Sequence, residues 1–151
     1  MGIFKTIINR ASGLLFPPRC PVCDCIQERG KLICDKCAGA LPYVRGKICI
    51  KCGKPTEGGT ICTDCKKGEH CFTQARAVWV LDGGIKDAVY RFKFENRRDY
   101  AKFLAKEALK RQAGWIEEIA PDAIVAVPMH KEALKERGYN PINQIVGYIL
   151  S

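Results

Sequence analysis

The spacing of the cysteines constrains this chain more than any other feature of its sequence. Eight of the ten cysteines fall into four Cys-x-x-Cys pairs, with ten residues between the first two pairs and nine between the last two. Two cysteines at this spacing form a chelate that suits tetrahedral zinc, and two chelates complete a four-thiolate site. The predicted ligands of two structural zinc ions are Cys20, Cys23, Cys34, Cys37, Cys49, Cys52, Cys62 and Cys65.

Disulfides, redox motifs and iron–sulfur clusters are the competing interpretations of these pairs. Disulfides belong to oxidising compartments, and secreted chains normally carry a signal peptide. Here Lys5 and Arg10 interrupt the apolar N-terminal segment, and no small-residue cleavage site precedes Cys20. A redox motif would be a single pair beside a βαβ pattern rather than four pairs. We therefore expect structural zinc and a cytoplasmic protein.

The sequence leaves open how the pairs combine. Consecutive pairs would give two independent zinc ribbons, whereas a crossed arrangement of first with third and second with fourth would give one interleaved domain. The near-equal spacing within the two modules favours consecutive ribbons. Cys25 and Cys71 remain outside the pattern and are predicted to be free thiols.

Net charge alone says little about the partner. The formal charge is +9, but eight thiolates and two Zn²⁺ ions would lower it by four, to about +5. The distribution is more informative, because residues 91–111 carry eight basic and three acidic side chains. Such a run is commonly a solvated helix face, but it can also bind a phosphate backbone. The candidates for polyanion binding are Arg91, Lys93, Arg97 and Arg98.

Composition divides the chain into three segments. Residues 1–18 are predicted to include a short amphipathic helix that is too short and too interrupted to span a bilayer. Residues 19–71 hold the cysteine pairs and few large apolar side chains, so their folding should depend on metal. Residues 72–151 regain an apolar pattern and are predicted to form a separate domain.

Residues 72–151 are predicted to form the first part of an α/β domain with a parallel sheet. Apolar runs predict strands at 75–81 and 122–127, and the 3.6-residue period predicts the helices between and after them. These helices begin near Ile85, Tyr100, Lys131 and Pro141, with breaks at Asn96 and Gly138. Two strands are fewer than a stable sheet normally has, so the domain is predicted to be incomplete.

Four motifs in order resemble the ComF family of bacterial competence-associated proteins. Pro17-Pro18-Arg19-Cys20-Pro21-x-Cys23 with the second cysteine quartet is similar to the double zinc ribbon that opens those proteins. Residues 92–98, 125–130 and 137–144 are similar to the family's "LKYxGxR", "VPVPLH" and "RGFNQ" segments. Two small departures are Asn96 in place of the usual Gly, and Pro-Ile-Asn inserted between Asn140 and Gln144.

The resemblance implies a type I phosphoribosyltransferase scaffold after the zinc ribbons. The turn after Val127 would then be the pyrophosphate loop, with His130, Lys131 and Arg137 as candidates to contact pyrophosphate. The major departure is that residues 1–151 lack the paired acidic residues and Thr/Gly loop that grip ribose and its 5′-phosphate in this reaction class. The ordinary alternative for residues 128–139 is a plain strand-to-helix connection.

The expected function is that of a ComF-like protein linked to competence and DNA uptake, without transferase activity in this form. Whether any form is an enzyme stays open; Mg²⁺ and phosphoribosyl pyrophosphate would be needed only by a full-length, active form. The alternative is a zinc-ribbon docking module for nucleic acid or protein. Its expected partners are single-stranded DNA and a DNA-uptake helicase or another competence protein.

Overall fold

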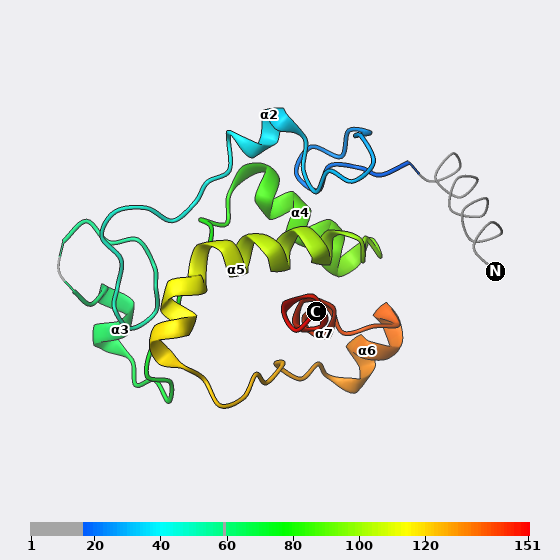
Figure 1. Cartoon of the computed structure of the whole chain (residues 1–151). Helices are drawn as coiled ribbons and strands as arrows, with labels where there is room; N and C mark the ends of the chain where they lie inside the picture. The colour runs from blue at the N-terminus through cyan, green and yellow to red at the C-terminus, as the bar shows by residue number, and fades with distance from the viewer. Residues whose placement is uncertain (1–16, 59) are drawn as a thin grey trace.

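The computed structural model describes residues 17–58 and 60–151, and in this part of the chain the regular secondary structure is helical. The helices are α2 (Asp35–Ala38), α3 (Thr63–Lys67), α4 (Gly83–Phe94), α5 (Tyr100–Ile119), α6 (Lys131–Arg137) and α7 (Pro141–Ile149). Figure 1 shows α7 below α5, seen nearly along its axis, with α4 and α2 on the opposite side of α5. Most of the helix predicted in residues 1–18 lies outside the described residues.

The core forms between α4, α5 and the segment around Tyr139. Ile85, Ala88 and Phe92 recur on one face of α4 and are buried, as the 3.6-residue apolar period requires. Tyr100, Phe103 and Leu104 supply the facing surface of α5, and α7 packs against α5 through Ile145. None of the helices in the described ranges combines the length and apolar character that a bilayer crossing needs.

The helix boundaries follow local signals in the sequence and confirm several predictions. Asn96, predicted as a break, has a positive φ of 55° and separates α4 from α5. Gly138 ends α6 with a φ of 71°, a conformation that glycine adopts at little cost. Asn140 caps α7 by accepting from the amide of Ile142 at 2.9 Å, and Pro141 follows at the first helical position.

The two predicted strands were wrong, and so no parallel sheet is confirmed among the described residues. Residues 75–81 form no strand; they make a short antiparallel contact with 42–44, through an isolated bridge of Trp79 to Tyr43 and a bond from Val44 N to Val78 O of 3.0 Å, and Ala75 N donates to Lys51 O at 2.7 Å. Residues 122–127 form no regular secondary structure and pair with no strand, and Val125 is 85% exposed. An apolar run favours an extended backbone, but a strand also needs a neighbour for its amides and carbonyls.

The cysteine-rich segment packs directly on the helices. Leu41 belongs to the same buried cluster as Ile85 and Phe103, and Val22 and Ile33 pack against that cluster from the first ribbon. The contact at Gly84 is so close that a Cβ there would lie 2.5 Å from Val22 Cγ1. The first ribbon and the helices therefore share one core.

Candidate functional site

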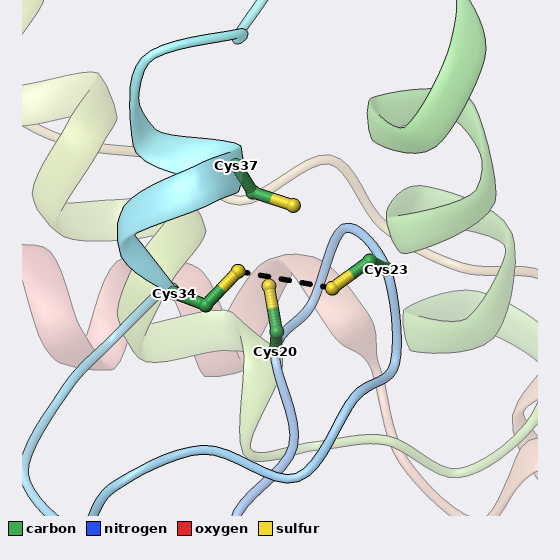
Figure 2. A group of neighbouring side chains, drawn as sticks. All are labelled: Cys20, Cys23, Cys34 and Cys37. Carbon is green, nitrogen blue, oxygen red and sulfur yellow. Dashed lines mark hydrogen bonds between the residues drawn. The ribbon is translucent and has the colours of Figure 1, made fainter.

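The eight predicted ligands form two four-cysteine clusters in the structure. In each cluster the sulfur atoms lie within 4.8 Å of one another, and in the first of them the four side chains converge on one point (Figure 2). The clusters join consecutive pairs, Cys20 to Cys37 and Cys49 to Cys65. The consecutive arrangement is therefore confirmed over the crossed one.

Both clusters are built from the same two local parts. The first pair of each ribbon lies in a tight turn, in which the amides of Asp24 and Gly53 donate to the carbonyls of Cys20 and Cys49 at 2.8 and 2.9 Å. We call each of these turns, residues 19–26 and 48–55, a knuckle. The second pair lies at the start of a short helix, where Cys34 and Cys62 occupy the N-cap positions of α2 and α3.

The sulfur spacing fits zinc. Four thiolates about 2.3 Å from a tetrahedral zinc ion lie about 3.8 Å from one another. The Sγ atoms of Cys23 and Cys34 are 3.8 Å apart, and those of Cys52 and Cys62 are 3.7 Å apart. With four sulfur ligands in each cluster and no open position, both centres have the character of structural rather than catalytic zinc sites.

The pKa values of the thiols show why a cation is needed. In the second ribbon a hydrogen bond from the backbone amide of Cys62 is the largest influence on Cys49, and it lowers the pKa of that thiol to about 6. In the first, burial raises the pKa of Cys20, but amide donors from Cys34, Cys23 and Val22 outweigh it and bring it to about 7. Burial together with the neighbouring thiols raises the pKa of Cys65 to about 12, and the pKa of Cys37 rises for the same reasons. One thiolate thus forms easily in each cluster, whereas four require a metal cation among them.

The remaining cysteines lie outside the two clusters. Cys25 is exposed, and its thiol lies 3.8 Å from the carbonyl of Cys23. Cys71 is also exposed. Both are free thiols in the structure, as predicted.

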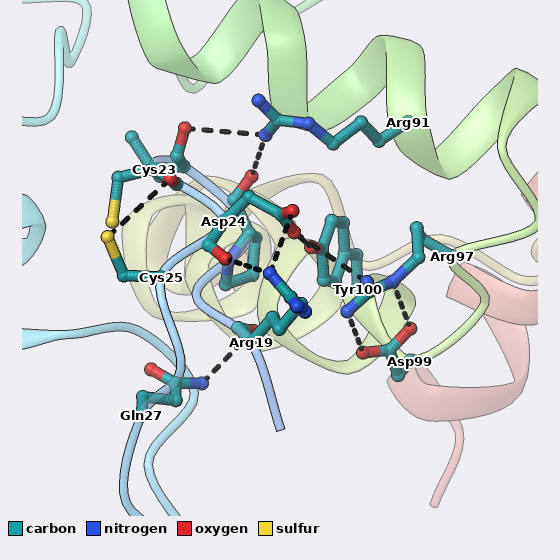
Figure 3. Close-up of polar contacts among 11 residues, drawn as sticks. Arg19, Cys23, Asp24, Cys25, Gln27, Arg91, Arg97, Asp99 and Tyr100 are labelled. Carbon is teal, nitrogen blue, oxygen red and sulfur yellow. Dashed lines mark hydrogen bonds and ion pairs between the residues drawn. The ribbon is translucent and has the colours of Figure 1, made fainter. Parts of the chain in front are cut away.

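The first knuckle is attached to the helices by polar contacts (Figure 3). Arg91 Nη1 donates to the carbonyls of Pro21 and Val22, at 3.1 and 3.5 Å, inside the first Cys-x-x-Cys turn. Tyr100 donates its hydroxyl hydrogen to Asp24 Oδ1 at 2.8 Å. Burial, followed by this bond, raises the pKa of Tyr100. The knuckle is therefore held from both α4 and α5.

The four predicted polyanion-binding side chains do not lie on one surface. Arg91 donates a hydrogen bond to the first knuckle, and Arg97 is paired with Asp99 at 3.2 Å and Asp24 at 3.6 Å. Lys93 and Arg98 instead face a cleft on the other side of the α4–α5 connection. Polyanion binding by these residues stays a prediction, and the structure separates them into two pairs.

The cleft brings two sets of predicted residues together. Its volume is about 360 Å³, and it is lined by Lys93, Phe94, Asn96, Arg98, Glu136, Arg137 and Tyr139. We call this the basic cleft. Arg98 lies over the ring of Tyr139 at 4.4 Å and Arg137 over the ring of Phe94 at 4.5 Å. Lys93 and Arg98 were predicted as polyanion-binding residues from the basic run, whereas Arg137 was predicted to contact pyrophosphate.

The other two pyrophosphate-loop candidates lie apart from this cleft. His130 occupies the N-cap position of α6 and Lys131 is its first residue, whereas Arg137 ends the same helix. His130 is 76% exposed at its side chain and lies 3.7 Å from Glu132. The structure thus places these three candidates at opposite ends of α6 rather than around one ligand position.

Sequence reasoning missed the aromatic side chains beside the basic cleft. Tyr90 and Phe94 are each 57% exposed, and their ring centroids are 5.0 Å apart on the outer face of α4. Two aromatic residues four positions apart on a helix share a face. That spacing was the available signal, because Ile85, Ala88 and Phe92 already account for the buried face.

Comparison with known proteins identifies the cysteine-rich part. A family model described as a double zinc ribbon domain matches residues 11–66. Competence protein ComFC of Bacillus subtilis (strain 168) is 24% identical over 153 residues, which cover 87% of this chain and 62% of that protein. The chain thus spans about three fifths of the length of this curated relative. No solved structure matches the chain.

The last helices match a second family. The model of the IreB regulatory phosphoprotein family matches residues 118–151. A UPF0297 protein of Ruminiclostridium cellulolyticum is 70% identical over 27 residues, covering 18% of this chain and 30% of that protein. Its counterpart in Acetivibrio thermocellus is 90% identical over 20 residues, covering 13% of this chain and 22% of that protein. Residues 118–151 include two of the four ComF-like motifs, so this stretch resembles both families.

Geometry and comparisons agree best on the first half of the chain, where two four-cysteine centres coincide with the double zinc ribbon match. The ComFC match extends the likeness over most of the remaining residues. The resemblance of this chain to the ComF family is therefore confirmed, and a double zinc ribbon with two candidate structural zinc centres forms its first folded part.

Proposed function

We propose that this ComF-like protein binds single-stranded nucleic acid at the basic cleft and that its zinc ribbons are structural. The observation that carries the proposal is the convergence of Lys93, Arg98 and Arg137 in one cleft beside two exposed aromatic rings. The competence protein among its relatives makes DNA the nucleic acid to test first.

The charge in the cleft suits a phosphate backbone. Three cations face one carboxylate, that of Glu136. The guanidinium groups of Arg98 and Arg137 are held against aromatic rings, which limits the side-chain entropy lost when a phosphate binds. Arginine also offers paired N–H donors that match phosphate oxygens.

The aromatic pair adds a contact that a nucleic acid would use and a free pyrophosphate would not. Tyr90 and Phe94 expose their rings next to the cleft, and unpaired bases stack on such rings with about 1–3 kcal/mol per base. An inorganic or sugar-linked pyrophosphate would engage the cations and leave the rings without a role. This difference favours a single strand over pyrophosphate.

We do not assign a phosphoribosyl transfer to residues 1–151. That reaction needs acidic groups for the ribose hydroxyls and a loop for the 5′-phosphate, and neither motif is present in these residues. The cations of the basic cleft can hold phosphate groups, but binding alone does not break the bond to C1 of the sugar. The activity of the longer relative is a separate question.

A salt titration of single-strand binding tests the proposal. The zinc-loaded protein should bind labelled oligothymidylate of about 20 nucleotides at low salt, with a slope of log K against log salt near −2 if three phosphates are neutralised. Arg98→Ala combined with Arg137→Ala should reduce the slope by about 1.4 and weaken binding at least about tenfold. Fluorescence anisotropy measures both quantities.

Lys66→Ala combined with Lys67→Ala is the matched control, because it removes two charges from the exposed α3 of the second ribbon. This variant should keep nearly all of the wild-type affinity. Equal losses in the two double variants would contradict a specific cleft and leave only a net-charge effect. A failure of the wild type to bind at low salt would remove the proposal.

A further inference from the structure

The connection between α4 and α5, residues 95–99, separates the basic cleft from the first ribbon; we call it the elbow. Its two arginines point to opposite sides. Arg97 faces the first ribbon, where it pairs with Asp24 and lies 4.6 Å over the ring of Tyr100. Arg98 faces the cleft, where its Nε donates to Asn96 Oδ1 at 2.8 Å. A shift of the elbow would therefore move Arg98 relative to the cleft.

Asp24 connects the first knuckle to this elbow. It follows the ligand Cys23, and its amide donates to the carbonyl of Cys20 at 2.8 Å, so the metal-binding turn fixes its backbone. Its Oδ1 accepts from the hydroxyl of Tyr100 at 2.8 Å and lies 3.6 Å from Arg97. Figure 3 shows the carboxylate between the knuckle and these two side chains. One side chain thus joins a metal-binding turn to the residues on both sides of Arg98.

The second ribbon supplies an internal comparison. Gly53 occupies the position equivalent to Asp24, with a φ of 73° against 58° for Asp24. Glycine adopts this conformation readily, whereas other residues do so at a cost. The first knuckle therefore accepts a less favourable backbone residue, whose carboxylate reaches the helices. The second knuckle has no side chain at this position to form such a connection.

We propose that Asp24 is a positioning residue that transmits the geometry of the first zinc knuckle to the elbow and thereby holds Arg98 at the basic cleft. The inference rests on the proposed function of that cleft. It predicts that metal in the first ribbon governs nucleic-acid binding, whereas the second ribbon has no equivalent connection to the elbow.

The sign of the effect separates positioning from simple charge. Asp24 carries a negative charge on the ribbon side of the elbow, so its removal would strengthen polyanion binding if charge alone mattered. If Asp24 positions the elbow, its removal weakens binding instead. The two explanations therefore predict opposite changes for the same substitution.

The test replaces Asp24 by Gly, which reproduces the second knuckle and keeps the turn conformation. Asp24→Gly should retain two zinc ions per chain, speed hydrogen exchange of the amides of residues 98–101, and weaken oligothymidylate binding about fivefold, because only part of the free energy of the lost internal hydrogen bond passes to binding. Asp24→Asn should recover most of the affinity, because its amide oxygen can accept from Tyr100 and Asn tolerates a positive φ.

The control is Asp64→Asn in the second ribbon, which removes one negative charge that pairs with Lys54 at 2.8 Å and should leave the elbow amides unchanged. Tighter binding by both Asp24 variants, or unchanged exchange at 98–101, would overturn the inference while the proposed function stands. Loss of binding by the wild type would instead refute the proposed function, and the exchange data would still decide whether Asp24 holds the elbow.

Discussion

At the scale of single residues, two glycines differ in how closely the rest of the chain packs around them. A Cβ on Gly53 would lie 2.8 Å from the Cα of Arg76, and the residue has a φ of +73°. Gly114 differs in both respects, since nothing lies within 4 Å of the position its Cβ would take, and it lies inside α5. The same substitution should therefore have opposite effects at the two sites.

Gly53→Ala should destabilise the zinc-loaded protein by about 3 kcal/mol, combining the strain of a left-handed alanine with overpacking against backbone. Gly114→Ala should stabilise it by about 0.5–1 kcal/mol, because alanine loses less backbone entropy in a helix. Urea denaturation at fixed zinc concentration measures both. A loss of less than about 1 kcal/mol at Gly53 would contradict the close packing of the second knuckle on residues 75–77.

Residue-scale patterns also show what the sequence could predict. The eight zinc ligands were identifiable because metal geometry fixes their spacing. The breaks at Asn96 and Gly138 were identifiable because few residues adopt a positive φ easily. Asp24 gave no such signal, since its role depends on Tyr100 and Arg97, more than seventy residues away in the sequence.

At the scale of elements, each ribbon is a separate metal-binding unit. Cys23→Ser and Cys52→Ser should each remove about one zinc ion, because each breaks one four-sulfur cluster. The two variants then report on the two sites separately. Metal analysis of the purified variants checks the count, and loss of both ions from one substitution would contradict independent ribbons.

The pH dependence of these two variants has a definite sign. The lowered pKa of Cys20, about 7, and of Cys49, about 6, means that the folded form holds these thiolates more strongly than an unfolded chain does. Their stabilising contribution is complete above the ordinary thiol pKa and is lost as the pH falls through about 7 in the first ribbon and about 6 in the second. Protons also compete with zinc for the thiolates.

Zinc release from both sites should therefore increase on acidification, and the two variants show this separately, because Cys23→Ser keeps the second site and Cys52→Ser keeps the first. A colorimetric chelator measures the release. Release that increases with rising pH in either variant would contradict this account.

The sequence predicted the helices correctly but not the strands. A helix satisfies its backbone hydrogen bonds locally, so the apolar period of α4 and the proline at the start of α7 were sufficient to place them. A strand depends on partners, and residues 122–127 have none among the described residues. Their apolar side chains stay exposed, with Val127 at 70%. Such unpaired edges favour association with another chain.

At the scale of the whole molecule, the first ribbon and the helices share one core. Leu41 is buried with residues of α4 and α5, and Asp24 joins the first knuckle to the elbow. The basic cleft forms from α4, the elbow and α6, so no single motif contains it. For that reason sequence patterns placed its residues in two unrelated sets.

The C-terminal stretch also shows how a family likeness can be incomplete. The insertion of Pro-Ile-Asn after Asn140 departs from the ComF pattern, and it lies within the match to the IreB family. In the structure this stretch begins a helix, because Asn140 is the N-cap of α7 and Pro141 is its first residue. The departure from the ComF motif after Asn140 thus lies in the stretch that also resembles the IreB family.

The claim on which the rest depends is that two four-thiolate zinc centres fold the first half of this chain. Zinc K-edge absorption, combined with elemental analysis of freshly purified protein, tests it most directly. We predict about two zinc ions per chain, each with four sulfur neighbours at about 2.3 Å and no nitrogen or oxygen ligand. A content well below two ions, or a first shell containing nitrogen or oxygen, would contradict the account.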